Sequence, residues 1–294
     1  MKSPFLLENQ EEYLEWRNFK LSQYPVCQEN FIVKFNNNII DKGNINLLKK
    51  LIKKYNFAIY EFESKLTDYD LHNFCSKLDL NKSISNLFSD SENISNITNK
   101  SEPKNKITNS EYIPYTEKRL NWHTDGYYYP TESSIKSFLL HCVQPAKKGG
   151  ENILLDHEIM YIYLRDHNPD YINILMQKNI MKIPKNKNLK DSNAISGPVF
   201  YIDENNFLNM RFTSREQNII WQKNDTIKKI KDFMFSFINE DTKYTFKLLL
   251  QENQGYLANN ILHKRESYID GKKKRLLKRI RFSNRIGKRN ANIE

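Results

Sequence analysis

The spacing of apolar residues along the chain alternates between a helical period and the two-residue period of a strand. In the first 80 residues, apolar side chains at helical spacing predict three amphipathic helices. The first covers residues 9–22, the second covers 45–55 after a candidate N-cap at Asn44, and the third lies around 71–78.

Short alternating segments predict β-strands between and after these helices. Two of them, at 31–35 and 57–62, make the first 80 residues a set of α/β elements that we expect to pack on a larger core. From residue 111 onward, short strands dominate and two helical patterns interrupt them. The strands are expected around Trp122 and at 137–143, 153–155, 198–202, 208–212, 244–250, 256–263 and 275–282, and the helices at about 157–166 and 226–239.

Many short strands separated by turn signals favour a β-sandwich or barrel core with helices packed outside it. The chain has 294 residues, 39% of them hydrophobic, which is enough for a sizeable core and compatible with one large domain or two small ones. We interpret residues 1–294 as a single domain, mostly β with flanking helices, whose core covers 111–283 and carries helical insertions.

Residues 81–110 differ from the rest of the chain because Ser and Asn dominate and no period is visible. A loop of this length inside a compact protein is often functional. Two interpretations stand side by side: a mobile lid that orders over a substrate, and a disordered insertion without a role.

Cysteine usage favours a reducing, cytoplasmic setting. Cys27, Cys75 and Cys142 are odd in number and far apart, so they form neither a disulfide framework nor a zinc motif. The first residues lack a signal-peptide apolar region, and no apolar run approaches membrane-spanning length. We therefore expect no membrane partner.

The formal net charge of +11 raises the question of a nucleic-acid partner. The chain is rich in Lys, Asn, Ile and Tyr, the residues of AT-rich codons, and its lysines are scattered along predicted helix faces. Nucleic acid is therefore an unlikely partner, although the basic C-terminal third keeps that alternative open. A homo-oligomer is also compatible with the sequence.

The first candidate for chemistry is the run Trp122-His-Thr-Asp125-Gly. In an extended chain, residues i and i+2 point to the same face, so His123 and Asp125 converge while Trp122 and Thr124 face the other way. One imidazole and one carboxylate supply two-thirds of the 2-His-1-carboxylate triad that holds non-haem Fe(II) with open positions.

A third ligand and an anion site are predicted near the C-terminus. His263 ends a strand pattern, Arg275 begins another, and Asp270-Gly271 between them is a hairpin signal. In such a hairpin His263 and Arg275 lie opposite each other, roughly 5 Å apart at Cα. A short dicarboxylate then chelates a metal held by His263 and receives a bidentate bond from Arg275 at its far end. That arrangement suits 2-oxoglutarate.

These motifs together resemble one family. The chain is similar to the taurine dioxygenase-like (TauD/TfdA, clavaminate synthase-like) Fe(II)/2-oxoglutarate oxygenases, whose fold is a double-stranded β-helix or cupin-like jelly roll. The resemblance covers residues 111–283 well and the N-terminal third only in its element order. The motifs are Trp122-His-Thr-Asp125, Gly149-Gly-Glu-Asn152, Asn260-Ile-Leu-His263-Lys-Arg265 and Arg275-Leu-Leu-Lys-Arg279.

The resemblance implies that His123, Asp125 and His263 bind iron. It also implies that 2-oxoglutarate and O2 are cosubstrates and that the reaction is a hydroxylation or a related oxidation, since halogenating members of the family lack the carboxylate that Asp125 supplies. Arg275 would hold the far carboxylate of 2-oxoglutarate, helped by Asn152, where the family usually has Thr.

The substrate side rests on fewer residues. The resemblance places Arg279 near 2-oxoglutarate or an anionic group of a small-molecule substrate. Tyr127, together with Trp122 and the two tyrosines that follow it, is a candidate wall of an aromatic cage. Such a cage would suit a betaine-type substrate. Three alternatives to an anion hydroxylase therefore remain: a quaternary-ammonium hydroxylase, a nucleic-acid-binding or -modifying protein, and a non-catalytic cupin-like binding module.

Two further histidines are predicted to be structural. His141 lies within an apolar strand pattern, which is typical of a core histidine with a satisfied side chain. His157 follows Asp156, a plausible N-cap, and is expected to begin the helix at 157–166.

Overall fold

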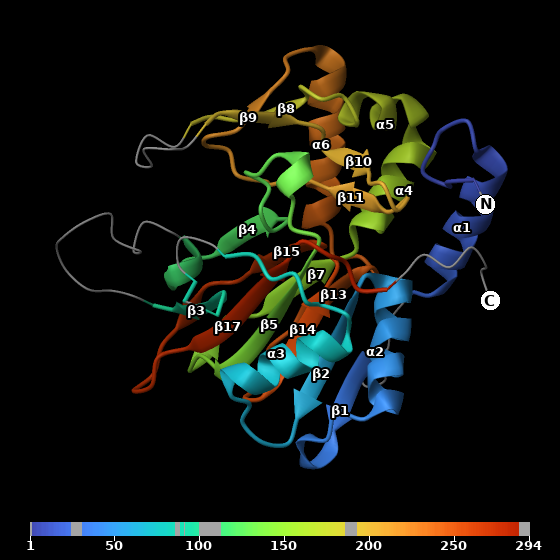
Figure 1. Cartoon of the computed structure of the whole chain (residues 1–294). Helices are drawn as coiled ribbons and strands as arrows, with labels where there is room; N and C mark the ends of the chain where they lie inside the picture. The colour runs from blue at the N-terminus through green and yellow to red at the C-terminus, as the bar shows by residue number, and fades with distance from the viewer. Residues whose placement is uncertain are drawn as a thin grey trace.

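A six-stranded sheet and a four-stranded sheet form the centre of the molecule (Figure 1). The structure, a computed structural model, describes residues 2–24, 31–85, 89–90, 92–99, 113–185 and 193–287. The larger sheet has the order β1-β2-β14-β5-β17-β3, with β1 and β2 parallel and the other neighbours antiparallel. Its strands are β1 (Ile32–Phe35), β2 (Phe57–Phe62), β14 (Gln254–Ala258), β5 (Ser137–Gln144), β17 (Leu276–Phe282) and β3 (Ile94–Thr98).

The smaller sheet is antiparallel throughout and has the order β13-β7-β15-β4. Two sheets that share a core confirm the expected mostly β architecture, and they stay separate sheets rather than one closed barrel. The four strands are β13 (Thr245–Leu248), β7 (Asn152–Leu155), β15 (Leu262–Arg265) and β4 (Leu120–His123).

Two helices cover the outer face of the larger sheet, α2 (Lys42–Tyr55) and α3 (Asp68–Lys77) (Figure 1). The N-cap predicted at Asn44 is wrong. Helix α2 begins three residues earlier, where the side chain of Asp41 accepts the backbone N–H of Asn44. Asp is as good a cap as Asn, so local propensity alone did not choose between them.

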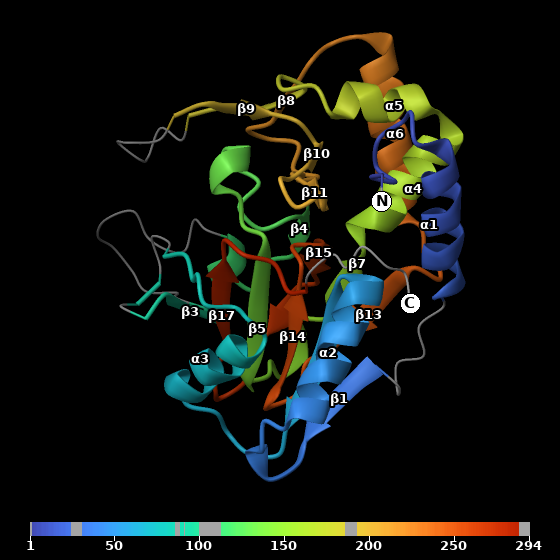
Figure 2. The same cartoon turned by 45° about the vertical axis from the view of Figure 1, so that its right-hand side comes forward.

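A second layer of helices lies at one end of the sheets, with α1 beside α4 (Figure 2). The helices predicted at 9–22, 157–166 and 226–239 are all present. The strands predicted at 198–202 and 208–212 are also present in shorter form. The other short elements were not predicted, because segments of two or three residues carry almost no periodic signal. The helices outside the two sheets are α1 (Gln10–Ser22), α4 (His157–His167), α5 (Pro169–Leu175) and α6 (Asp225–Asn239). The short strands are β6 (Lys148–Gly149), β8 (Met181–Ile183), β9 (Ile195–Gly197), β10 (Phe200–Ile202), β11 (Leu208–Met210), β12 (Ile220–Trp221) and β16 (Tyr268–Ile269), and the 3-10 turns are Asn36–Asn38, Ile113–Tyr115 and Thr131–Ser133.

A buried ion cluster fastens α1 to the start of α4. Lys20 lies 2.5 Å from Asp156 and 2.6 Å from Glu158 and also donates to the carbonyl of Lys54. A buried charge of this kind needs both ionic and hydrogen-bonding partners. The cluster explains why a lysine occupies the apolar side of α1.

The expectation of an unstructured loop at 81–110 is wrong for part of that stretch. Residues Ile94–Thr98 form β3, which pairs with β17 at the edge of the larger sheet. A Ser/Asn-rich sequence does not by itself favour a strand, and pairing with a neighbouring edge supplies what propensity lacks. Residues 86–88, 91 and 100–110 lie outside the described residues, so the interpretation as a lid is not tested there.

The single strand predicted at 256–263 is two strands in different sheets. Strand β14 ends at Ala258 in the larger sheet, and β15 begins at Leu262 in the smaller one. Between them Asn260 adopts a left-handed conformation with φ 49°, which Asn tolerates better than most residues. This bend carries the chain across the core and delivers His263 to the smaller sheet.

The hairpin predicted at Asp270-Gly271 is also wrong. Both edges of β15 are already paired, with β7 and β4, so β17 cannot pair with it. The chain instead forms the short strand β16 against β6 and then enters the larger sheet between β5 and β3. His263 and Arg275 therefore come from opposite sheets and are not cross-strand neighbours.

None of the described helices is both long and apolar enough to cross a membrane. Cys75 and Cys142 are free and buried, while Cys27 lies outside the described residues. Both described thiols are thus core residues, as the sequence predicted for Cys75.

His141 is a core histidine, as predicted, and it gives the fold a pH dependence. Its ring stacks on Tyr60 in the interior at 1% exposure, and burial lowers its pKa to about 4. An unfolded chain takes up this proton near pH 6.5. Its contribution to stability is therefore complete above pH 6.5 and is lost as pH falls toward 4.

We expect a His141→Phe variant to lose less stability on acidification than the wild type. Between pH 7.5 and pH 5 the difference should be about 2 kcal/mol, because the variant has no proton to bind at this position. Urea unfolding of both proteins at the two pH values measures it. In the wild type the Tyr60 hydroxyl is hydrogen-bonded to Nδ1 of His141 at 3.3 Å. Loss of this bond destabilises the variant equally at both pH values. If the two proteins lose the same stability on acidification, the pKa assigned to His141 is contradicted.

Candidate active site

Three side chains that the sequence singled out converge between the two sheets. His123 ends β4, Asp125 follows two residues later, and His263 lies opposite His123 on β15. Oδ1 of Asp125 is 3.7 Å from Nε2 of His123 and 3.8 Å from Nε2 of His263, and one donor atom from each residue lies within 4.8 Å of the others. This donor set suits one divalent transition metal.

Hydrogen bonds to the backbone fix both imidazole rings. Nδ1–H of His123 donates to the carbonyl of Asn121, and Nδ1–H of His263 donates to the carbonyl of Ile261. With Nδ1 protonated, each Nε2 keeps its lone pair and directs it toward Asp125. Outer hydrogen bonds of this type are typical of metal-binding histidines.

Electrostatics keep the donors in the states that a metal requires. Burial lowers the pKa of His123 to about 3, with a further effect from His263, and burial also lowers the pKa of His263. Burial alone would raise the pKa of Asp125, but the guanidinium groups of Arg279 and Arg281 hold it well below its usual range. At neutral pH the site therefore presents two neutral imidazoles and one carboxylate.

Gly126 permits the tight turn that aims Asp125 inward. Its φ is +69°, and a Cβ at this position would lie 2.6 Å from the side chain of Ile135. Any other residue would therefore meet both backbone strain and a clash directly after the carboxylate.

Asn260 positions the same turn, and the sequence analysis missed its role. Its amide oxygen accepts from the backbone N–H of Asp125 at 2.7 Å, and its Nδ2 donates to the carbonyls of Asp125 and Ile135. The bend between β14 and β15 is thereby tied to the segment that carries Asp125. No local pattern could reveal this, because the partners are separated by 125 and 135 residues.

We expect Asn260→Gly to destabilise the protein by about 2–3 kcal/mol, the contribution of three buried hydrogen bonds. Glycine tolerates the left-handed conformation, so this variant reports the lost amide alone. Asn260→Ala should cost about 1 kcal/mol more, because it adds backbone strain. Urea unfolding gives both values, and a loss below 1 kcal/mol in Asn260→Gly would show that the amide does not hold the turn.

Several buried polar groups near the triad have no hydrogen-bond partner among the described residues. Two of them are Nη1 of Arg275 and Nδ2 of Asn152. Such donors are costly unless a ligand satisfies them. Both residues line a small cavity between the sheets that also receives His263 and Arg279, so the fold brings these four side chains to one place. The lining residues are Ile97, Pro114, Leu120, Phe138, Leu140, Asn152, Tyr256, His263, Arg265, Arg275, Leu277 and Arg279.

The guanidinium of Arg275 differs from that of its neighbours on β17. It lies over the ring of Tyr268 at 4.9 Å, and burial lowers its pKa. Arg265 also lines the cavity, but it donates to three backbone carbonyls and is thereby occupied. Arg275 is therefore the guanidinium with capacity for an added anion at this end of the cavity.

Two more arginines on β17 lie beside the carboxylate of the triad. Nη1 of Arg279 is 3.4 Å from Oδ1 of Asp125, and Nε of Arg281 is 2.7 Å from Oδ2. Arg279 was predicted from the sequence as a site residue, whereas Arg281 was not. The two-residue period of a strand, which places both arginines on one face, was the signal that could have found it.

The aromatic cage expected from Trp122 and the tyrosines does not form with Trp122. Strand alternation turns Trp122 away from His123 and into the core cluster beneath α4 and α6. Tyr127 remains near the site, with its ring 6.5 Å from that of His123 and its hydroxyl accepting from Arg215. Trp122 therefore cannot line a substrate site beside the triad.

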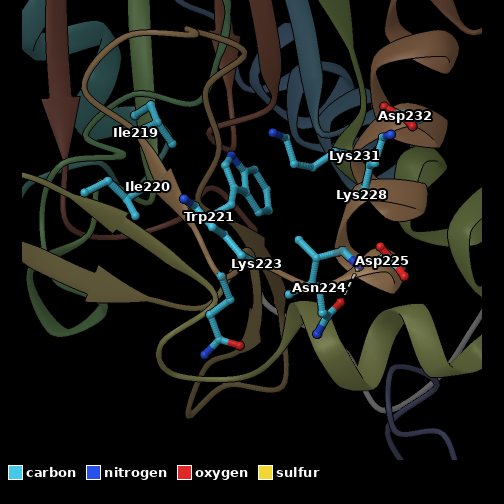
Figure 3. Close-up of a pocket in the computed structure, with 11 residues that line it drawn as sticks. Ile219, Ile220, Trp221, Lys223, Asn224, Asp225, Lys228, Lys231 and Asp232 are labelled. Atoms are coloured by element: carbon cyan, nitrogen blue, oxygen red, sulfur yellow. Dashed lines mark hydrogen bonds between the residues drawn. The ribbon is translucent and has the colours of Figure 1, made fainter.

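A larger hollow lies elsewhere, between β12 and the first turns of α6 (Figure 3). Its volume is about 760 Å³, and Lys231 lies over the ring of Trp221 in it. It shares no residue with the cavity beside the triad, and its described lining contains no group of metal ligands. We therefore place the chemistry at the triad rather than in the larger hollow.

Comparisons with known proteins agree with this geometry. The profile of the family described as "Taurine catabolism dioxygenase TauD, TfdA family" matches residues 19–281. Two curated relatives, from an Amycolatopsis species and a Streptomyces species, are both named uridine-5'-phosphate dioxygenase. They are 27% identical over 155 residues and 28% identical over 178 residues.

The relatives match only part of their own length. The aligned segments cover 51% and 58% of this chain and 55% and 64% of the relatives, so the chain spans less than two thirds of either. Among solved structures, a taurine dioxygenase from Burkholderia xenovorans is similar with a TM-score of 0.58 and 10% identity, over 83% of this chain and 82% of that chain. At that identity the likeness shows the fold, and the fold is the expected jelly roll.

Proposed function

Because this chain belongs to the taurine catabolism dioxygenase TauD, TfdA family, we propose that it is an Fe(II)- and 2-oxoglutarate-dependent dioxygenase that hydroxylates a small anionic substrate. In this proposal His123, Asp125 and His263 hold the iron. The single observation that carries it is the convergence of their donor atoms within 4.8 Å, in a buried site with both imidazoles oriented by hydrogen bonds.

The far carboxylate of 2-oxoglutarate is assigned to Arg275 and Asn152. The support is that both offer a buried donor without a partner, in the cavity that also receives His263. A carboxylate there would accept from both groups and relieve the cost of leaving them unpaired.

Bound iron supplies the oxidising chemistry with O2, and the protein supplies orientation, charge and exclusion of water. His123 and His263 present neutral Nε2 atoms, while Asp125 supplies the anionic donor. Phe138 and Leu140 give part of the cavity lining an apolar surface, and ionic contacts are stronger where water is excluded.

A count of charges favours an anionic substrate. The guanidinium groups of Arg265, Arg275, Arg279 and Arg281 and an Fe(II) ion would face the carboxylate of Asp125 and the two carboxylates of 2-oxoglutarate. Three positive charges remain in excess, which favours an anionic substrate. Both curated relatives carry the name uridine-5'-phosphate dioxygenase, so nucleoside 5'-phosphates are the first substrates that we propose.

The test is succinate release from 2-oxoglutarate by the iron-loaded protein across a panel of nucleoside 5'-monophosphates, aminosulfonates, carboxylates and betaines. We expect stimulation by an anionic compound, with the matching uncharged nucleoside giving none. Stimulation by betaines alone would replace the anion with a quaternary ammonium. Absence of iron binding and of any succinate release would leave a non-catalytic binding module.

Part of the positive charge of the C-terminal third is not available to a nucleic acid. Arg265, Arg275, Arg279 and Arg281 are buried between the sheets, where a phosphate backbone cannot reach them. We also propose that the enzyme works in the reducing cytoplasm, which suits Fe(II) and the free thiols of Cys75 and Cys142.

A further inference from the structure

Arg281 lies beside the triad, and neither the family description nor the names of the relatives assign it a role. Strand alternation puts it on the same face of β17 as Arg275 and Arg279. It is 6% exposed, its Nε–H donates to Oδ2 of Asp125 at 2.7 Å, and its Nη1 donates to the hydroxyl of Tyr128 at 3.4 Å.

The two oxygens of Asp125 have different surroundings. Oδ1 lies 3.7 Å and 3.8 Å from the Nε2 atoms of His123 and His263, at the point where a metal would meet all three donors. Oδ2 is taken by Arg281 through a short, charge-assisted hydrogen bond. The carboxylate thus has one oxygen directed at the metal position and one held away from it.

Arg279 does not duplicate this contact. Its Nη1 approaches Oδ1 rather than Oδ2, and the distance of 3.4 Å is at the limit of a hydrogen bond. Its Nε is buried without a partner. Arg279 is therefore available to an added anion, whereas Arg281 is committed to Asp125.

Tyr128 gives the guanidinium of Arg281 a second point of attachment. The rings of Tyr127 and Tyr129 lie 5.3 Å and 4.8 Å from the ring of Tyr128. Because Tyr128 lies three residues after Asp125, Arg281 contacts both ends of the same short segment.

We propose that Arg281 is a positioning residue that holds Oδ2 of Asp125, so that the metal meets Oδ1 alone. A carboxylate that chelates with both oxygens would occupy one of the open positions that the triad leaves for cosubstrate and O2. This inference rests on the proposed iron site, and it assigns to Arg281 a role that differs from anion binding by Arg275 and Arg279.

The test uses Co(II) as an air-stable probe of the metal site in the full chain. Affinity is measured by equilibrium dialysis, and the ligand set of the metal is followed through the position and intensity of the visible absorption bands. The variants are Arg281→Met, which removes the donor, and Arg281→Lys, which keeps the charge without the Nε–H. Lys278→Met is the matched control, because Lys278 pairs with Asp68 on the opposite face of β17.

We expect Arg281→Met to weaken Co(II) binding about 10- to 100-fold, the usual effect of losing the partner of a metal ligand. Its bands should change in position and intensity as Asp125 becomes bidentate, Arg281→Lys should fall between Met and wild type, and Lys278→Met should match wild type. A purely structural role would lower stability without changing the bands of the folded, loaded protein.

Three results would overturn the inference. Equal or tighter Co(II) binding by Arg281→Met with unchanged bands would show that Arg281 does not direct the carboxylate. Unchanged metal binding with a raised KM for the substrate would place Arg281 in the substrate site. If Arg281→Met fails to fold, wild-type affinity and bands in Arg281→Lys would show that charge alone suffices. A wild-type protein that binds no Co(II) would instead refute the iron site itself.

Discussion

Replacement of Asp125 by Ala is expected to abolish both metal binding and turnover. Asp125 supplies the anionic donor between the two imidazoles, and its Oδ1 is nearly equidistant from both. Removing a residue that only hydrogen-bonds to a metal ligand weakens metal binding about 10- to 100-fold. Removing the ligand itself should therefore weaken Fe(II) or Co(II) binding at least about 100-fold. Equilibrium dialysis and succinate release measure the two effects.

The same change should lower stability, because the carboxylate is also an ionic partner. Arg281 is buried against Asp125, and removing one member of such a pair costs about 3–5 kcal/mol. Asp125→Asn keeps the volume and an acceptor for Arg281 and should therefore fold better while still losing the charge that the metal needs. Asp68→Asn, which removes a carboxylate on the far side of β17, is the matched control. Full oxygenase activity in either Asp125 variant would show that the triad is wrongly assigned.

Arg275→Ala and Arg279→Ala are expected to weaken the binding of two different ligands. Arg275 lies at the Asn152 end of the cavity with a buried donor free for an anion, whereas Arg279 lies beside Asp125. We therefore expect Arg275 to hold the far carboxylate of 2-oxoglutarate and Arg279 to serve the anionic group of the substrate.

The expected effects follow from the strength of charge-assisted hydrogen bonds. Loss of such a partner from a buried anion costs about 2–3 kcal/mol, or about 30- to 150-fold in affinity. Arg275→Ala should raise the dissociation constant of 2-oxoglutarate by this factor. Arg279→Ala should mainly raise the KM of the substrate and leave decarboxylation of 2-oxoglutarate without substrate largely in place.

Anaerobic titration of 2-oxoglutarate into both metal-loaded variants decides the matter. Comparable losses in the two variants would contradict the division between the arginines. Wild-type affinity in Arg275→Ala would remove the cosubstrate site from this end of the cavity. Asn152→Ala should show a smaller loss than Arg275→Ala, because a neutral donor contributes less than a charged one.

The sequence by itself determined the local elements and the identity of the reacting groups. The side chains that face a core recur every two residues in a strand and about every 3.6 residues in a helix. These two periods in the sequence predicted strands such as β5 and β7 and helices such as α4 and α6. The His-x-Asp spacing placed His123 and Asp125 on one face for the same reason. The same alternation turns Trp122 to the opposite face, and the structure places it in the core, so the prediction that it lines the substrate site is wrong.

Only the tertiary structure decided how distant segments meet. The sequence predicted that His263 and Arg275 lie together, but through a hairpin that does not exist, because β7 and β4 already occupy both edges of β15. They reach one cavity from opposite sheets instead. The contacts of Asn260 and Arg281 with Asp125 join residues more than 130 positions apart. Such contacts depend on how the sheets pack and on which strands pair, and no local period encodes either.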